Sequence, residues 1–158
     1  MSSGATKTRI DFTAAAPWQA ERPETLVLCC SDGRWHAQIE EYVQHQISAR
    51  ADMYVVPGGP AGLSLWSASF EESRGMEKAF HFLATHHELK SAWLIGHENC
   101  AYYQTKYAST HDQNFILRRQ FEDLERARLT IMGWQGDLIV KKVFASLQSG
   151  RVVFQVIE

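Results

Sequence analysis

The sequence has no long apolar run and no excess of charge of either sign. None of its segments approaches the roughly 18 to 20 consecutive apolar residues that a membrane-spanning helix needs. Its 16 basic and 18 acidic residues give a formal net charge of -2, so it lacks the basic field that attracts nucleic acid or anionic lipid. These absences argue against a membrane span and against nucleic-acid binding, and they leave small neutral or anionic molecules as the expected ligands.

Cysteine is also scarce, with 3 residues in the chain. An odd number of cysteines argues against a disulfide framework, as does the reducing cytosol. Residues 1–16 lack the charged-then-apolar order of a secretory signal, so we expect a cytoplasmic protein. A chain of 158 residues, 45% of them hydrophobic, is long enough for one domain with a real core and short for two. We expect one α/β domain over residues 1–158, with residues 1–22 as an N-terminal arm.

The apolar pattern changes period along the chain. Residues 26–30 form a wholly apolar run, which is typical of a strand buried on both faces of a parallel sheet, and residues 34–47 follow with helical spacing. The later segments read as a strand at 53–56, a helix at 72–89, a strand at 92–96, a mostly helical region at 102–132, and a hairpin of strands at 138–147 and 152–157. This βαβαβ order predicts an α/β fold with a mainly parallel central sheet, helices on both faces and an antiparallel C-terminal edge strand.

Three candidate metal ligands follow two of these strands. Cys30 ends the first strand, and His97 and Cys100 come directly after the third. Open α/β sheets bind ligands at the carboxyl ends of their strands. Two thiolates and one imidazole suit zinc, and three protein ligands leave the fourth position for water or substrate. Cys29 would face the other side of its strand, so we exclude it from the site.

An acidic and a basic residue follow the first cysteine closely. Asp32 could meet the metal or its water, and Arg34 could hold that carboxylate through a fork of hydrogen bonds. Each of these features taken singly has an ordinary explanation, such as a buried thiol or a hydrogen-bonded loop histidine. Their joint placement at two strand ends favours a metal site, either open for chemistry or closed by Asp32 as a permanent fourth ligand.

Other residues invite weaker interpretations. The remaining histidines show no consistent ligand spacing, so we expect them to be solvated or packed, with His36 and His111 as the candidates for a proton shuttle. The five tryptophans have no basic stripe beside them and favour core or subunit contacts. The loop at 57–62 lacks the Lys-Ser/Thr of a phosphate loop, and its glycines indicate backbone close to a small ligand or a tight turn.

The two motifs together resemble those of the β-class carbonic anhydrases. The chain carries Cys-x-Asp-x-Arg at 30–34 and His-x-x-Cys at 97–100, each in the strand context described above. The resemblance extends from about residue 26 to the C-terminus. It includes the glycine-containing loop at 55–62 and a last hairpin with a glycine turn at 143–153.

The resemblance implies a zinc lyase with Cys30, His97 and Cys100 as ligands of Zn²⁺ and with Asp32 and Arg34 as catalytic residues. Its reaction would be the reversible hydration of carbon dioxide to bicarbonate by a zinc-bound hydroxide. Asp32 would orient the zinc water or replace it as the fourth ligand, and Arg34 would hold Asp32. The family also implies a homodimer or higher homo-oligomer with its active sites near the subunit interface.

The sequence departs from the family pattern at two places. The family loop commonly reads Arg-Asn-Ala-Gly, whereas residues 56–59 are Val-Pro-Gly-Gly and lack a cationic and an amide side chain. The family's glycine after the second cysteine is Ala101, and Tyr102 and Tyr103 follow, which could narrow the pocket, alter it for another substrate or pack inward. Two alternatives therefore stay open: a zinc hydrolase of a carbon dioxide analogue such as carbon disulfide or carbonyl sulfide, and a non-catalytic zinc-binding homologue closed by Asp32.

Overall fold

The computed structural model describes residues 11–48, 50–65, 67–110 and 112–158. Residues 11–24, within and just beyond the predicted N-terminal arm, contain no helix or strand, and the arm itself stays a prediction. The first ten residues of that arm, the candidate shuttle His111 and the candidate contact residue Trp66 lie outside the described residues. Within the described part of the chain, no helix combines the length and the apolar character that crossing a membrane requires.

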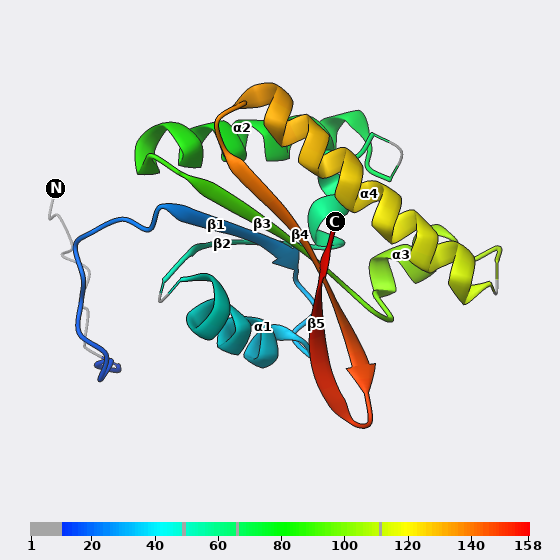
Figure 1. The fold of residues 1–158 in the computed structure, drawn as a ribbon, viewed down its shortest axis with the longest axis horizontal. Coiled ribbons are helices and arrows are strands. Elements are labelled where there is room, and N and C mark those ends of the chain that lie inside the picture. The colour runs from blue at the N-terminus through cyan, green and yellow to red at the C-terminus, as the bar shows by residue number, and fades with distance from the viewer. Residues whose placement is uncertain (1–10, 49, 66, 111) are drawn as a thin grey trace, which may run out of the picture.

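Within the described residues, five strands form one sheet in the order β2-β1-β3-β4-β5 (Figure 1). The strands are β1 (Thr25–Cys30), β2 (Asp52–Val56), β3 (Ser91–His97), β4 (Ile139–Gln148) and β5 (Arg151–Ile157). The first four pair in parallel, and β5 pairs antiparallel with β4 at the edge. The predicted fold class, with its antiparallel C-terminal edge strand, is therefore confirmed.

Helical segments connect the strands and differ from the predictions in detail. They are α1 (His36–Tyr42), the π-helix η1 (Val43–Ile47), the 3-10 helix η2 (Gly59–Leu63), α2 (Phe70–His87), α3 (Ala101–Lys106) and α4 (Gln113–Trp134). The first predicted helix widens near its end, where the Ser48 N–H donates to the Val43 carbonyl at 2.9 Å. The predicted helical region at 102–132 is two helices, because the Asp112 side chain accepts hydrogen bonds from Asn114 and Phe115 and so starts α4 anew.

Strand β1 separates two apolar cores, because alternate side chains of a strand point to opposite faces. Leu26 and Leu28 pack in the core beneath α2 and α4. Val27 and Cys29 pack with Trp35 in the core beneath α1. Figure 1 shows α1 on one side of the sheet and α2 and α4 on the other, as the buried apolar run of β1 predicts.

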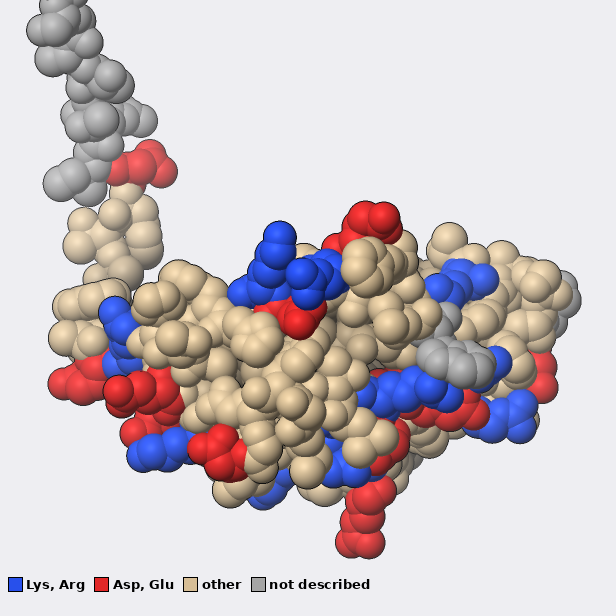
Figure 2. All heavy atoms as spheres, turned by 90° about the horizontal axis from the view of Figure 1, so that it is seen from above, with Lys and Arg blue, Asp and Glu red and all other residues tan. Residues whose placement is uncertain are grey.

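The described tryptophans divide between core and surface, and charges of both signs share one face of the molecule. Trp35 and Trp93 are buried, as expected of core residues, whereas Trp18 is exposed. Figure 2 shows acidic and basic side chains interspersed over the face that carries α2 and α4. That face presents no continuous basic field of the kind that nucleic acid requires.

Candidate metal centre

The sheet brings the three candidate ligands to one edge. Strands β1 and β3 are parallel neighbours, so Cys30 and His97, their last residues, end at the same edge. Cys100 stands directly before α3 and returns to this edge through a tight turn. Asn99 makes that turn with φ of 56°, a left-handed conformation that asparagine tolerates better than most residues.

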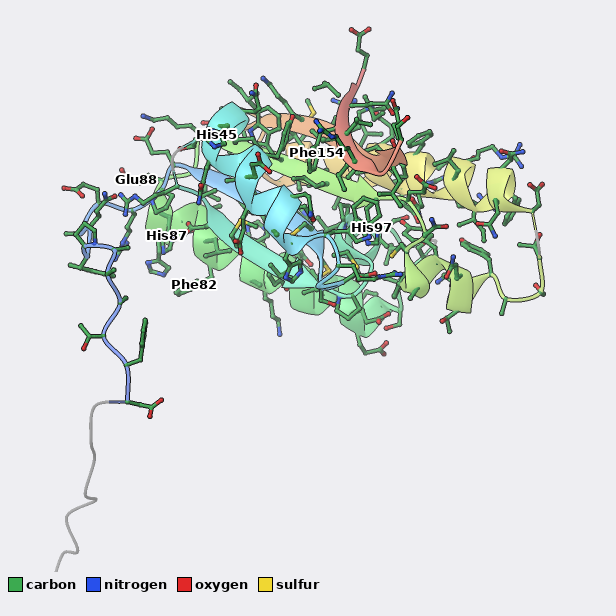
Figure 3. All side chains as sticks on the ribbon, turned by 90° about the horizontal axis from the view of Figure 1, so that it is seen from below. His45, Phe82, His87, Glu88, His97 and Phe154 are labelled. Atoms are coloured by element: carbon green, nitrogen blue, oxygen red, sulfur yellow. The ribbon has the colours of Figure 1, made fainter. Side chains whose placement is uncertain are left out.

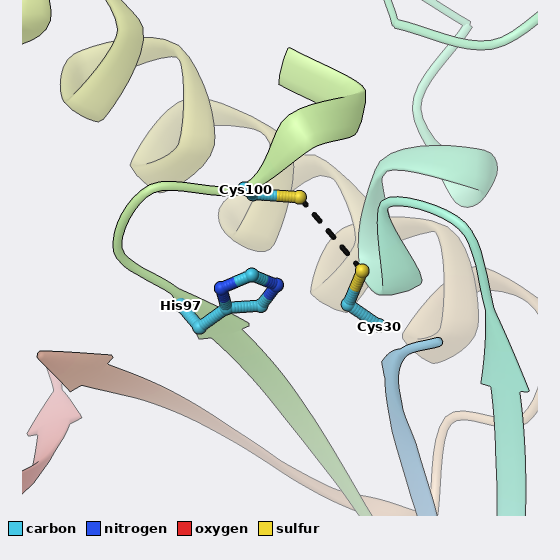
Figure 4. Close-up of side chains that lie close together, drawn as sticks. All are labelled: Cys30, His97 and Cys100. Atoms are coloured by element: carbon cyan, nitrogen blue, oxygen red, sulfur yellow. Dashed lines mark hydrogen bonds between the residues drawn. The ribbon is translucent and has the colours of Figure 1, made fainter. Parts of the chain in front are cut away.

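The three candidate ligand atoms lie close enough together to share one metal ion. Cys30, His97 and Cys100 are buried and offer ligand atoms that all lie within 4.8 Å of one another (Figure 4). The two sulfur atoms are 3.8 Å apart. Two thiolates about 2.3 Å from one zinc ion at the tetrahedral angle would be about 3.8 Å apart. The observed sulfur separation therefore fits zinc without rearrangement.

His97 presents one ring nitrogen to the thiols and fixes the other. Its Nδ1–H donates to the Glu98 carbonyl at 2.8 Å, and its ring packs on Trp35 with centroids 4.9 Å apart. Nε2 is buried and has no hydrogen-bond partner among the described residues. A buried nitrogen without a partner costs free energy, which a metal bond would recover. The donor set and this unpartnered nitrogen fit a soft or borderline divalent metal.

The pKa values of the cysteines distinguish Cys30 and Cys100 of the site from the adjacent Cys29. The hydrogen bond between the Cys30 and Cys100 sulfurs is the main cause that lowers the pKa of Cys30, and burial acts in the opposite direction. The same hydrogen bond raises the pKa of Cys100, and burial adds to the rise. Burial raises the pKa of Cys29 to about 12, and this residue lies in the core beneath α1, as its exclusion from the site requires.

Asp32 and Arg34 form the fork predicted from their spacing. Arg34 Nε donates to both carboxylate oxygens of Asp32, at 2.9 and 3.1 Å, and Nη2 donates to Oδ2 at 2.5 Å. These bonds hold the pKa of Asp32 down at about 2. Arg34 Nη2 also donates to the Asn99 carbonyl at 3.3 Å, and this bond connects the Asp32–Arg34 ion pair to the turn between His97 and Cys100.

A cleft of about 620 Å³ opens beside this pair, with Cys30 in its wall. Gly58 and Tyr102 also line the cleft, and the tyrosine ring covers the glycine so closely that a Cβ on Gly58 would lie 2.6 Å from Tyr102 Cδ1. The glycine-rich loop turns tightly, with φ of 74° at Gly58, and brings backbone to the cleft; that a small ligand lies against this backbone stays a prediction. Of the two phenols, Tyr102 narrows the cleft.

Tyr103 packs inward onto a buried carboxylate that the sequence analysis missed. Asp123 of α4 is 2% exposed and accepts hydrogen bonds from Ser64 Oγ at 2.6 Å, from Tyr103 OH at 2.9 Å and from Ser67 Oγ. Burial beside this carboxylate raises the pKa of Tyr103. The missed signal was the spacing of Asp123 with Gln120 and the buried apolar residues of α4, on a helical face where a charge needs partners.

The other described histidines do not join the three ligands. His36 lies near the site, but its Nε2 is 3.1 Å from the Cys30 carbonyl and so acts as a donor to the backbone. His87 pairs with Asp52 across the start of β2. Figure 3 shows His45 and His87 well away from His97. Among the described residues, the candidate metal group consists of Cys30 at the end of β1, His97 at the end of β3 and Cys100 just before α3.

A buried cysteine–histidine–cysteine group beside a cleft, at the carboxyl edge of a mainly parallel sheet, defines an α/β protein with a candidate metal centre. No family model matches the sequence, and no curated protein matches it. Solved structures do match, and β-carbonic anhydrases are among them.

One of these is a tetrameric β-carbonic anhydrase from the ascomycete Sordaria macrospora, at a TM-score of 0.54 and 15% identity over 88% of this chain and 84% of that one. CafA of Aspergillus fumigatus matches at 0.54 and 13% identity over 85% and 76% of the two chains. The β-carbonic anhydrase CcaA matches at 0.53 and 16% identity over 87% and 78%. The chain therefore has the β-carbonic anhydrase fold.

Proposed function

We propose that this protein is a zinc-dependent carbonic anhydrase that interconverts carbon dioxide and bicarbonate. The observation that carries the proposal is the buried group of two sulfurs 3.8 Å apart and an unpartnered imidazole nitrogen, placed beside the Asp32–Arg34 pair. The fold shared with β-carbonic anhydrases supports it.

In this proposal Cys30, Cys100 and His97 Nε2 hold Zn²⁺. The metal supplies Lewis acidity that lowers the pKa of a coordinated water towards neutrality. The hydrogen bond from His97 Nδ1 to the Glu98 carbonyl fixes the tautomer that leaves Nε2 free for the metal. Burial of all three side chains keeps competing ligands away from the protein side of the site.

Asp32 and Arg34 act on the nucleophile in the cleft. An aspartate with the ordinary pKa of 3.8 is ionised at neutral pH, and Arg34 lowers the pKa of Asp32 further, to about 2, so this carboxylate is a hydrogen-bond acceptor only. It orients a proton-bearing nucleophile by accepting its hydrogen bond, and the four bonds from Arg34 fix the direction of that acceptor. Arg34 is the one basic side chain among the described residues that line the cleft, and its charge favours the anionic product.

The proposal includes assembly and location. We propose a cytoplasmic homodimer or higher homo-oligomer. Phe12 and Trp18 are more than four-fifths exposed, and Met53 and Val55 on the edge strand β2 are also exposed, so apolar surface is available for a second copy. The solved enzymes of Sordaria macrospora are described as tetrameric. Light scattering that gives only the mass of one chain, in zinc-loaded protein, would contradict this part.

The decisive experiment is stopped-flow carbon dioxide hydration on protein of verified zinc content, with two matched variants. Cys100→Ala and Cys29→Ala remove thiols that are both nearly fully buried, so their packing costs are comparable. We expect Cys100→Ala to lose zinc and turnover and Cys29→Ala to keep both. Stoichiometric zinc without turnover in the unaltered protein would refute the proposed activity, and full zinc binding by Cys100→Ala would refute the proposed ligands.

A second candidate function keeps the same site and changes the substrate. Pro57, Gly58 and Tyr102 make one side of the cleft uncharged, and this side suits carbon disulfide or carbonyl sulfide as well as carbon dioxide. Release of hydrogen sulfide by the zinc-loaded protein, together with slow bicarbonate formation, would favour this candidate. Fast bicarbonate formation without hydrogen sulfide release would exclude it.

A further inference from the structure

A second cavity of about 350 Å³ lies between the start of α4 and the β4–β5 hairpin. It shares no lining residue with the cleft at the metal centre. Its wall includes Glu98 and Asn99, the two residues between His97 and Cys100. A molecule in this cavity would therefore contact the turn that carries two of the candidate metal ligands.

One buried side chain in the cavity lining has a polar atom without a partner. Gln120 on α4 is 4% exposed, and its Oε1 makes no hydrogen bond to any described residue. Gln120 lines the cavity. A buried carbonyl oxygen without a donor costs free energy that an occupant with an N–H or O–H group would recover. We therefore expect an occupant of the cavity to carry a hydrogen-bond donor for Gln120 Oε1.

The charge of the lining narrows the chemistry of the occupant. In the described wall, Glu98 is the one ionisable side chain, and neither lysine nor arginine is present. The Glu98 carboxylate already accepts the Leu147 N–H at 2.9 Å and so is held in place. A neutral or cationic molecule suits this wall, whereas an anion such as bicarbonate would meet a carboxylate with no balancing cation.

The opposite part of the wall is apolar and aromatic. The rings of Phe121 and Phe144 meet edge to face with centroids 5.0 Å apart, and Ile116 and Leu117 lie beside them in the lining. Pockets for small molecules commonly combine such apolar walls with a few polar groups that set orientation. A flat ring on one side of the molecule and N–H groups on the other would match both walls.

We propose that this cavity is a second binding site, which accepts a small uncharged or cationic N–H donor with an apolar ring. The ring packs against Phe121 and Phe144, and the N–H groups reach Gln120 Oε1 and the Glu98 carboxylate. This site is independent of the proposed hydration of carbon dioxide, because its ligand differs in charge and shape from that substrate and its product.

Three probes of one shape and different charge test the site. Zinc-loaded protein labelled with nitrogen-15 is titrated with benzamidine, benzamide and benzoate, which are cationic, neutral and anionic. We expect benzamidine and benzamide to shift the amide signals of Glu98, Asn99 and residues 113–121, and benzoate to bind at least about tenfold more weakly. Equal binding of benzoate, or absence of shifts around the cavity at millimolar benzamidine, would overturn the proposal and leave water as the occupant.

Matched variants locate the contact. Gln120→Leu removes the unpartnered acceptor, and Gln44→Leu makes the same change at an exposed position of η1. We expect Gln120→Leu to weaken benzamidine about tenfold and Gln44→Leu to leave its affinity unchanged. Asn114→Trp fills the exposed rim of the cavity and should also abolish binding, which keeps the test informative if Gln120→Leu folds poorly. Unchanged affinity in both Gln120→Leu and Asn114→Trp would refute the assignment.

Discussion

Neighbouring residues of this chain have opposite chemistry because a strand turns them to opposite faces. Cys29 is enclosed in an apolar core and its pKa rises to about 12, whereas Cys30 meets Cys100 and His97, whose hydrogen bonds lower its pKa. Asp32, one further alternation along, reaches the cleft and pairs with Arg34. At the scale of residues, the candidate site is a matter of which way each side chain points.

Loss of the fork on Asp32 should slow turnover without releasing the metal. Arg34→Ala removes the three side-chain hydrogen bonds that direct the carboxylate, and changes to such supporting groups cost about 10- to 100-fold. Arg34→Lys keeps the charge but cannot form the fork, so we expect an intermediate rate. The measurements are stopped-flow hydration and zinc content, and an unchanged rate in Arg34→Ala would remove Arg34 from the mechanism.

The buried carboxylate of Asp123 should make Tyr103 a stability residue. Tyr103→Phe deletes one of three donors to a charge that is 2% exposed, so we expect a loss of about 1 to 3 kcal/mol in the free energy of unfolding. Tyr102→Phe is the matched control, since its hydroxyl donates to the Ser67 carbonyl instead of a carboxylate. Urea denaturation of the zinc-free proteins measures the free energy of unfolding of both variants. Equal losses would show that a hydrogen bond to the buried Asp123 carboxylate contributes no more than one to a backbone carbonyl.

Elements place the site by where they end and how they turn. The ends of β1 and β3 set Cys30 and His97, the start of α3 sets Cys100, and η2 brings the glycine loop against β1. A Cβ on Gly59 would lie 2.8 Å from the Cys30 backbone nitrogen, so only a glycine lets the backbone of this loop pack directly against the backbone of Cys30.

Gly58→Ala should therefore destabilise the protein, although it adds a single methyl group. The residue has φ of 74°, and its new Cβ would meet the Tyr102 ring, so we expect a loss of about 1 to 3 kcal/mol. Gly75→Ala, in an exposed part of α2 with nothing within 4 Å, should instead gain about 0.5 to 1 kcal/mol. Thermal unfolding tests the opposite signs, and a stabilised Gly58→Ala variant would contradict the packing described here.

Sequence patterns predicted the strands, their order along the chain and the cysteine–histidine–cysteine group, because short apolar runs and strand-end motifs are local signals. They could not place Asp123, whose partners Ser64 and Tyr103 lie 59 and 20 residues away along the chain. Nor could they show which of Tyr102 and Tyr103 enters the cleft. Both lie in the short helix α3, and its orientation depends on distant contacts, of Tyr102 with Gly58 and of Tyr103 with Asp123. The sequence also could not predict the π-helix η1, since the helical spacing of apolar residues does not distinguish a final π-turn from a continuing α-helix.

At the scale of the whole molecule, the two cores lie on opposite faces of one sheet, and side-chain hydrogen bonds connect the last helix, α4, to that sheet. Glu125 on α4 accepts hydrogen bonds from Arg128 on the same helix and from Lys142 on β4 at 2.6 Å. Lys142 also donates to the backbone carbonyl of Glu158 at 3.1 Å, so one ammonium joins helix, sheet and C-terminus. These charges lie at the border of the core beneath α2 and α4.

This connection should make stability depend on acid pH. Arg128 and then Lys142 lower the pKa of Glu125 from 4.5 to about 2 in the folded protein. A depressed pKa means that the folded state binds protons less readily than the unfolded state, so the stabilisation is complete above pH of about 4.5 and disappears as the pH falls towards 2. Glu125→Gln should lose this dependence, while Glu122→Gln on the same helix should keep it. The measurement is the difference in urea midpoint between each variant and the unaltered protein at pH of about 6 and about 3, which cancels the loss of metal common to all three. A difference for Glu125→Gln that does not shrink on acidification would show that Glu125 does not hold α4 to the sheet through its charge.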